Sequence, residues 1–274
     1  MATRTRPAPA TCHRRRTLGF LIALAAVTTG GAAQVCAQPV PPSAGIWHSD
    51  TAEHALADAS RRTLVTSLRR ITGLPDIVFS ADGRIEIGTG RRGGGSRIAE
   101  DVLRTALASG DVFVIQDHSG SPSVTFGQIE SLDYINDQTG RRVRVWWVRL
   151  DFDDFRTVHA SKRVRAAFDP GFVLLHELLH ALGHRDDLAP GALGDCERIL
   201  NGARRELGLP LRADYAAIRV APAGIGPDAR LRFEDAGPGR PDSRVRHLFF
   251  RTTPGAAGER MTTLRPRGRG RTPS

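Results

Sequence analysis

The chain has 274 residues, of which 40% are hydrophobic and 25% are charged, a balance typical of a soluble globular protein. Its formal net charge of +10 is concentrated at the two ends, because residues 38–223 together have a net charge of −1. The central part therefore lacks the basic surface that a nucleic-acid partner requires, and we expect no such partner.

Residues 1–37 have the layout of an export signal. An arginine-containing start is followed by the apolar run LGFLIALAAV, which is short for a membrane span, and then by small residues up to Ala37. We expect cleavage after Ala37 and a secreted, periplasmic or cell-envelope location in a bacterial-type cell, with no stable membrane partner. Residues 14–20 also resemble a twin-arginine signal and Cys36 a lipidation site, so the export route stays open. After cleavage only Cys196 remains, which excludes an intramolecular disulfide.

The rest of the chain divides into a Pro-rich linker at residues 38–45, a folded domain at 46–222 and a tail at 223–274. Apolar spacing and turn residues predict, in chain order, a helix over 51–71, a β-hairpin over 76–89, a helix over 97–107, strands over 111–116 and 141–152, and helices over 170–183, 196–207 and 212–220. The tail is rich in Gly, Pro and Arg, and we expect most of it to be disordered, apart from one strand at RHLFFR. The order of elements indicates an α+β fold, with a mixed β-sheet packed on one apolar helix and a smaller helical C-terminal part.

The stretch FDPGFVLLHELLHALGHRDD combines three histidines and four acids with a predicted apolar helix. Asp169 is suited to cap this helix, because Pro170 follows at its first position. Helical spacing puts His176 and His180 one turn apart on the same face, where two imidazoles can hold one zinc ion. Glu177 is placed to act as the general base on a zinc-bound water. The H-E-x-x-H spacing therefore predicts a catalytic zinc site, against the alternative of two buried core histidines.

The third zinc ligand does not follow from helical spacing alone. Eight residues of straight helix span about 12 Å, which is too far for His176 and His184 to share one ion. Gly183 can end the helix in αL geometry, and the chain can then turn Asp186 back toward the metal. The pattern H-E-x-x-H-x-x-G-x-x-D resembles that of the metzincin zinc peptidases, and within them the snapalysin-like secreted bacterial enzymes, whose third ligand is Asp. Metzincins also need a methionine turn, for which this part of the chain has no methionine.

A second resemblance follows the predicted zinc helix. The stretch NGARRELGLPLRADY, which ends at Tyr215, is similar to the N-x-x-R-x-E-L-G-x-P-x-R-x-x-Y signature of NleD-like effector metallopeptidases and related bacterial toxin domains. Those proteins usually have Glu immediately before the Asn, where this chain has Leu200. If that Glu is their third ligand, Asp186 or Glu197 takes its place here. The resemblance also makes Arg212 and Tyr215 candidates for contact with the substrate or, as catalytic groups, with the oxyanion.

These observations predict an exported, zincin-like metalloendopeptidase with zinc as its cofactor and a protein or peptide as its substrate. The strand over 141–152 is expected near the cleft, with Trp146 and Trp147 either lining it or packing in the core. One alternative is a toxin-type peptidase with a single protein target, which shares the chemistry. The other is a zinc-stabilised binding protein without turnover. Glu177 argues against it, because a structural zinc site has four protein ligands and no use for a base. The sequence indicates no oligomeric state.

Overall fold

The computed structural model describes residues 43–135, 140, 142–184, 192–214, 217–220, 226–235, 244–252 and 262–263. The predicted export signal, most of the predicted linker, and the candidate site residues Asp186 and Tyr215 lie outside the described residues. In chain order the elements are β1 Gly45–His48, α1 Asp58–Thr72, β2 Ile77–Phe79, β3 Ile85–Ile87, α2 Arg97–Ala108, β4 Val112–Asp117, β5 Gly127–Ile135, β6 Arg142–Leu150, α3 Phe152–Thr157, α4 Lys162–Ala167, α5 Pro170–Ala181, α6 Asp195–Glu206, β7 Leu211–Arg212, β8 Ile218–Arg219, β9 Ala229–Glu234, β10 Val245–Phe250 and β11 Thr262–Thr263.

The first sheet has four strands in the order β1-β4-β6-β5. β1, β4 and β6 run parallel, and β5 pairs antiparallel with β6 at one edge, so the sheet is mixed, as predicted. The crossover from β1 to β4 contains α1, the β2–β3 hairpin and α2, which is the kind of long connection that parallel strands need. The overall class, α+β with a mixed sheet and several helices, is therefore confirmed.

The two tryptophans of β6 lie on opposite faces of this sheet. Trp147 is buried in a small cluster that includes Trp47. Trp146 packs against the main core and donates its indole N–H to Asp111 at 2.8 Å. Of the two roles considered for them, packing is therefore the one that the structure supports.

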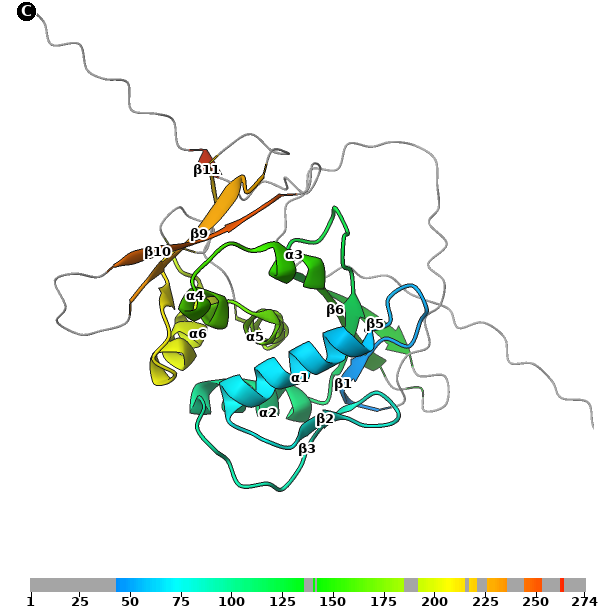
Figure 1. Ribbon diagram of the computed structural model, residues 1–274. Coiled ribbons are helices and arrows are strands. Elements are labelled where there is room, and N and C mark those ends of the chain that lie inside the picture. The colour runs from blue at the N-terminus through cyan, green and yellow to red at the C-terminus, as the bar shows by residue number, and fades with distance from the viewer. Residues whose placement is uncertain are drawn as a thin grey trace, which may run out of the picture.

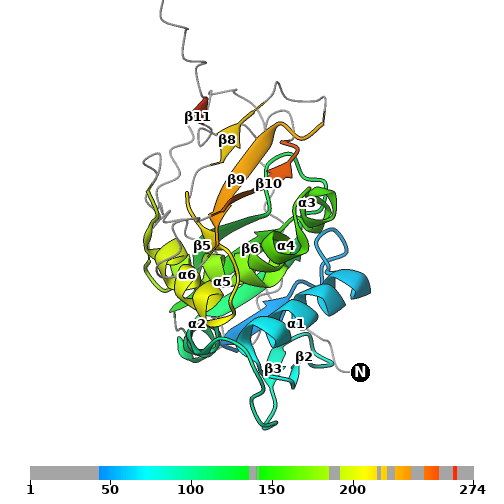
Figure 2. The same cartoon turned by 60° about the vertical axis from the view of Figure 1, so that its left-hand side comes forward.

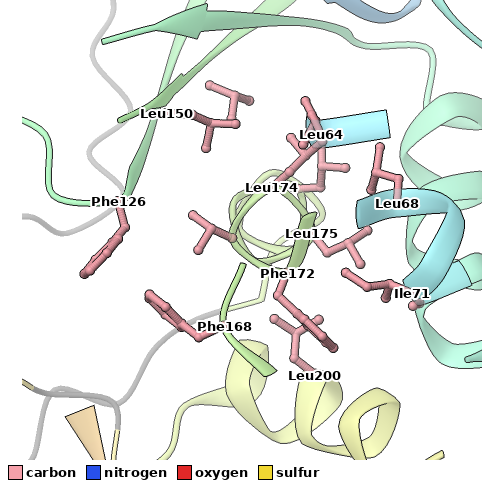
Figure 3. Packing of buried hydrophobic residues seen from close by; sticks show 14 of the residues in the cluster. Leu64, Leu68, Ile71, Phe126, Leu150, Phe168, Phe172, Leu174, Leu175 and Leu200 are labelled. Atoms are coloured by element: carbon pink, nitrogen blue, oxygen red, sulfur yellow. The ribbon is translucent and has the colours of Figure 1, made fainter. Parts of the chain in front are cut away.

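α5 lies at the centre of the molecule and contacts α1, α2, α6, β5 and β6. Ten of its twelve residues are buried, which explains why the helix is apolar around its whole circumference. Figure 3 shows Leu68 of α1, Leu200 of α6 and Leu150 of β6 approaching α5 from different sides. Because neighbours enclose it in this way, the side chains on α5 have well-defined positions.

A second sheet follows α6, with strands in the order β10-β9-β8-β11 and β7 paired to β9. Leu231 and Phe233 of β9, and Leu248 and Phe250 of β10, belong to the same buried hydrophobic cluster as α5. Figures 1 and 2 show this sheet next to α4, which contacts β10. The two sheets therefore share one core with α5 between them.

Three predictions about the C-terminal part are wrong. Residues 229–234 and 245–250 are strands that contribute to the core, so the core extends past residue 222, and the strand at 229–234 lies in the part of the tail that was expected to be disordered. The helix expected over 212–220 is replaced by β7 and β8, because both pair with β9. In the described residues the C-terminal part is accordingly one helix, α6, beside a sheet, and not mainly helical. The single strand expected at RHLFFR is confirmed as β10.

The elements predicted between residues 76 and 207 are present, with small shifts at their ends, and β5, α3 and α4 are additions to them. α1 begins at Asp58 instead of residue 51, because residues 51–54 form a turn in which the His54 N–H bonds to the Thr51 carbonyl at 3.0 Å. β1, which was not predicted, begins at Gly45, the last residue of the expected linker, and continues into the predicted domain. No helix in the described part of the chain has the length and apolar character that a membrane span requires.

Candidate metal centre

The start of α5 is closed by a side-chain cap. The Asp169 carboxylate accepts the backbone N–H of Phe172 at 3.1 Å, and Pro170 occupies the first helical position. Oδ2 of Asp169 also pairs with Arg70 of α1 at 2.6 Å. The predicted helix start is therefore confirmed, and it is tied to a neighbouring helix.

The end of α5 turns at Gly183, which has a φ of 93° in the left-handed region. Its N–H bonds to the His180 carbonyl at 3.1 Å, and the His184 N–H bonds to the Leu179 carbonyl at 3.0 Å. The turn expected at Gly183 is thus present directly after His180. Residues 185–191, which include Asp186, lie outside the part of the chain that the structure describes.

His176 and His180 lie one turn apart on α5, with their ring centroids 4.8 Å from each other. Cys196, in the first turn of α6, lies beside them, and one donor atom from each of the three residues lies within 4.8 Å of the other two. His176 and the neighbouring Glu177 are both 7% exposed. Imidazole nitrogen and thiolate sulfur are ligands that zinc prefers, so the donors in this group fit zinc better than magnesium or calcium.

The ring of His180 is oriented by the turn that follows the helix. Its Nδ1 lies 3.2 Å from the backbone oxygen of His184 and 3.6 Å from Sγ of Cys196. A carbonyl oxygen can only accept a hydrogen bond, so this contact places the hydrogen on Nδ1. The lone pair then resides on Nε2, which is the form of imidazole that binds a metal.

Glu197 follows Cys196 on α6 and is 1% exposed. Its Oε1 lies 3.1 Å from Nδ1 of His176 and 2.9 Å from Nη1 of Arg212, and Oε2 accepts from Arg204 at 2.6 Å. Burial alone would raise the pKa of this carboxyl, but Arg204, Arg212 and His176 together hold the pKa well below its usual value. Both oxygens are thus engaged, and the group of donors around the histidines contains Cys196 instead of Glu197. This arrangement argues against Glu197 as the third ligand.

Arg204 and Arg212 of the NGARRELGLPLRADY stretch contact the Glu197 carboxylate, and Asn201 contacts both arginines. Asn201 donates to the Arg212 carbonyl at 2.8 Å and accepts the Arg212 backbone N–H at 2.9 Å. Arg204 also donates to the Ala167 carbonyl at 2.9 Å. Arg212, a candidate for substrate contact in the resemblance, is buried and directs its guanidinium to Glu197. The structure therefore gives Arg212 an internal contact with Glu197.

β5 begins directly beside Glu177. A Cβ built on Gly127 would lie 2.5 Å from Cγ1 of Val173 and 3.3 Å from Oε1 of Glu177, so a larger residue does not fit without displacing a neighbour. The preceding residue, Phe126, has a φ of 61°, which is uncommon outside glycine, and Asp154 accepts its N–H at 2.9 Å. This tight turn brings an edge strand of the first sheet to the carboxylate of Glu177.

The structure brings His176, Glu177 and His180 together on one helix, while Asp186 and Tyr215 are outside the described residues. Cys196 is an addition that sequence reasoning missed, since it was considered only as an unpaired thiol. Cys196 could have been found from its position, because it lies next to Glu197 at the start of the helix that follows the H-E-x-x-H helix.

Comparisons with protein-family models, with curated proteins and with solved structures found no match to this chain. The resemblances to metzincins and to NleD-like peptidases therefore stay expectations based on short motifs. The fold is α+β with a mixed sheet. The candidate site is a largely buried group of two histidines, a glutamate and a cysteine: His176, His180, Glu177 and Cys196.

Proposed function

We propose that this chain is an exported zinc-dependent metalloendopeptidase with a zincin-like fold. The observation that supports the proposal is the placement of His176, Glu177 and His180 together on one enclosed helix, next to the start of an edge strand. His176 and His180 would hold the zinc ion, with Asp186 as the third ligand. A bound zinc ion supplies Lewis-acid chemistry, because it polarises a peptide carbonyl and makes water acidic enough to lose a proton near neutral pH.

Glu177 acts as the general base in this proposal. It accepts a proton from the attacking water and later transfers that proton to the leaving nitrogen of the cleaved peptide bond. Gly127 lets the start of β5 pack closely against this carboxylate, because a side chain there would contact Oε1 of Glu177 and Cγ1 of Val173.

The substrate would bind as an extended peptide along β5. Among the described residues β5 pairs only with β6, so its outer edge presents backbone N–H and C=O groups that have no strand partner. Peptides bind such an edge by adding a strand, through main-chain hydrogen bonds that any sequence can make. The first residue of β5, Gly127, lies beside Glu177. A peptide added along this strand would therefore pass the proposed base. This arrangement favours a protein or peptide substrate over a small molecule.

Asp186 and Cys196 are the two candidates for the third ligand. Cys196 lies near both histidines, but its Sγ is 3.6 Å from Nδ1 of His180, the nitrogen that carries the hydrogen. We therefore expect Asp186→Ala to lose stoichiometric zinc and Cys196→Ser to retain it, as measured by elemental analysis of the purified variants. The opposite result would assign Cys196 as the ligand.

A zinc-stabilised binding protein without turnover is the second candidate function. The observation in its favour is Cys196, because cysteine is a common ligand in closed structural zinc sites. In such a protein Glu177 has no chemical role. A toxin-type peptidase with one protein target shares the chemistry of the first candidate and differs only in its range of substrates.

The test is hydrolysis of a peptide library by the mature chain and by Glu177→Gln, with zinc content measured for both. We expect wild type to cleave peptides in a chelator-sensitive manner, and the variant to keep its zinc and lose about 10²-fold or more in kcat/KM. Glu86→Gln, on the exposed face of β3, is the matched control and keeps full activity. Equal hydrolysis by Glu177→Gln would remove the peptidase proposal. Stoichiometric zinc without hydrolysis in wild type would favour the binding protein.

A further inference from the structure

Glu197 lies at the centre of a buried ion cluster that also contains Arg204 and Arg212. The side chains of Glu197 and Arg204 are each 1% exposed, and that of Arg212 is 10% exposed. Nη1 of Arg204 lies 2.6 Å from Oε2 of Glu197, and Nη1 of Arg212 lies 2.9 Å from Oε1. The three charges are therefore withdrawn from water and depend on one another for compensation.

A buried cluster of this kind is a weak source of stability. Each ion loses several kcal/mol of hydration free energy, and well-packed apolar residues often stabilise a core equally well. The position of Arg204 over the Phe172 ring, 4.9 Å from its centroid, and the hydrogen bond to Ala167 offset only part of this cost. Orientation of another functional group explains the cluster better than stability does, and the group that Glu197 contacts is His176.

The contact between Glu197 and His176 affects which nitrogen of His176 carries the hydrogen. Oε1 of Glu197 lies 3.1 Å from Nδ1 of His176, a close contact whose angle at Nδ1 is not that of a hydrogen bond, so the carboxylate acts on the ring through its charge. An ionised carboxylate has no hydrogen to donate, so its charge favours a hydrogen on Nδ1 and leaves the lone pair on Nε2. Building on the zinc site proposed above, we propose that Glu197 is a positioning residue that holds His176 in the ring orientation and tautomer of a zinc ligand.

Arg204 and Arg212 direct the Glu197 carboxylate toward His176, one on each oxygen. Asn201 holds Arg212 through two hydrogen bonds with its backbone, and its Oδ1 accepts from Arg204 at 2.9 Å. The Asn and both Arg residues of the N-x-x-R-x-E-L-G-x-P-x-R stretch thus have a common effect. They support the metal helix from α6 and β7, and the proposal assigns them no contact with the substrate.

The experiment compares the zinc affinity of Glu197→Gln with that of wild type, by titration against a chelator of known affinity. Glutamine has a similar shape, but its amide has no charge and can donate as well as accept, so the preference for one tautomer of His176 is lost. We expect the zinc affinity to fall roughly 10- to 100-fold. Asp228→Asn is the matched control, because Asp228 is a fully buried carboxylate paired with Arg219 next to the second sheet. It is expected to lower stability and leave zinc affinity unchanged.

A second readout uses the zinc-free protein. The ¹⁵N NMR shifts of His176 distinguish the two tautomers, and we expect the Nδ1–H form in wild type and a mixture in Glu197→Gln. If Glu197→Gln does not fold, the double variant Glu197→Gln/Arg204→Met is measured in its place, because it removes one buried charge of each sign.

The outcomes separate this proposal from the proposed function. Weaker zinc binding and a changed tautomer, with Asp228→Asn at the wild-type zinc affinity, support the positioning role. If wild type binds zinc and the Glu197 variant keeps either its affinity or its His176 tautomer, the positioning role is overturned and the zinc site stands. Absence of zinc binding by wild type would refute the proposed function itself.

Discussion

Glu177 has little free space around its carboxylate, and this restricts which residues can lie next to it. Val173 precedes it by one helical turn, and Gly127 faces it from β5. The proposed base can therefore keep its position only if residue 127 has no side chain. A small change at this position tests whether the placement of Glu177 is needed for hydrolysis.

We expect Gly127→Ala to lower kcat/KM about tenfold or more while zinc stays bound. The added methyl would lie 2.5 Å from Val173 and 3.3 Å from Oε1 of Glu177, so one of them must move, and small displacements of a catalytic group have large effects on rate. Gly94→Ala is the control, because a Cβ at Gly94 meets nothing within 4 Å. Wild-type kinetics for Gly127→Ala would show that Glu177 is not where the chemistry occurs.

Asp154, which holds the turn at Phe126, makes the stability of the protein depend on pH. Burial raises its pKa from the usual 3.8 to about 6, with a further contribution from Asp151, although the hydrogen bond from Phe126 opposes the shift. Because the folded state binds this proton more tightly than the unfolded chain, the free energy of unfolding falls as pH rises from 3.8 toward 6.

Asparagine keeps an oxygen that can accept the Phe126 N–H and removes the charge. We therefore expect Asp154→Asn to unfold at higher urea concentration than wild type at pH 7, and to lose this advantage at pH 4. Equal midpoints at pH 7 would mean that the buried charge of Asp154 has no cost in the folded protein.

At the level of elements, α5 depends on signals that lie within its own sequence. Asp169 contributes a side-chain cap and also pairs with Arg70. We expect Asp169→Ala to lower the free energy of unfolding by about 1 kcal/mol or more. Asp195→Ala is the comparison, because Asp195 is an exposed acid in the first turn of α6, and we expect its effect to stay within about 0.5 kcal/mol. Similar losses in the two variants, measured by chemical unfolding, would contradict a specific capping role.

The same local signals explain which parts of the fold and the site are predictable. The cap, Pro170 and Gly183 determine both ends of α5, and His176, Glu177 and His180 share that helix, so their proximity follows from spacing alone. Cys196 belongs to another helix and reaches the histidines only through tertiary packing, which no local pattern records. β7 and β8 lie in a segment with helical spacing, and their pairing with β9, the next strand in the chain, overrides that tendency.

At the level of the whole molecule, the second sheet completes the core around α5. Four large apolar residues of β9 and β10 are buried in the same cluster as α5: Leu231, Phe233, Leu248 and Phe250. Complete burial of each contributes about 1.5–3 kcal/mol, and together this is comparable with the whole stability of a typical domain, about 5–15 kcal/mol. We therefore expect the segment after residue 222 to be needed for folding.

We expect a protein of residues 38–222 to lack cooperative thermal unfolding and dispersed amide NMR signals, whereas a protein of residues 38–274 shows both. A shortened chain that unfolds cooperatively and keeps its zinc would show that the second sheet is an addition to an independent domain.

The proposed zinc site includes two histidines one turn apart on α5 that hold the ion. Its most direct test is the zinc content of the purified mature chain and of His176→Ala/His180→Ala after dialysis against metal-free buffer. We predict one zinc per wild-type chain and none in the double variant. Equal zinc content in the two proteins, or none in wild type, would contradict this proposal.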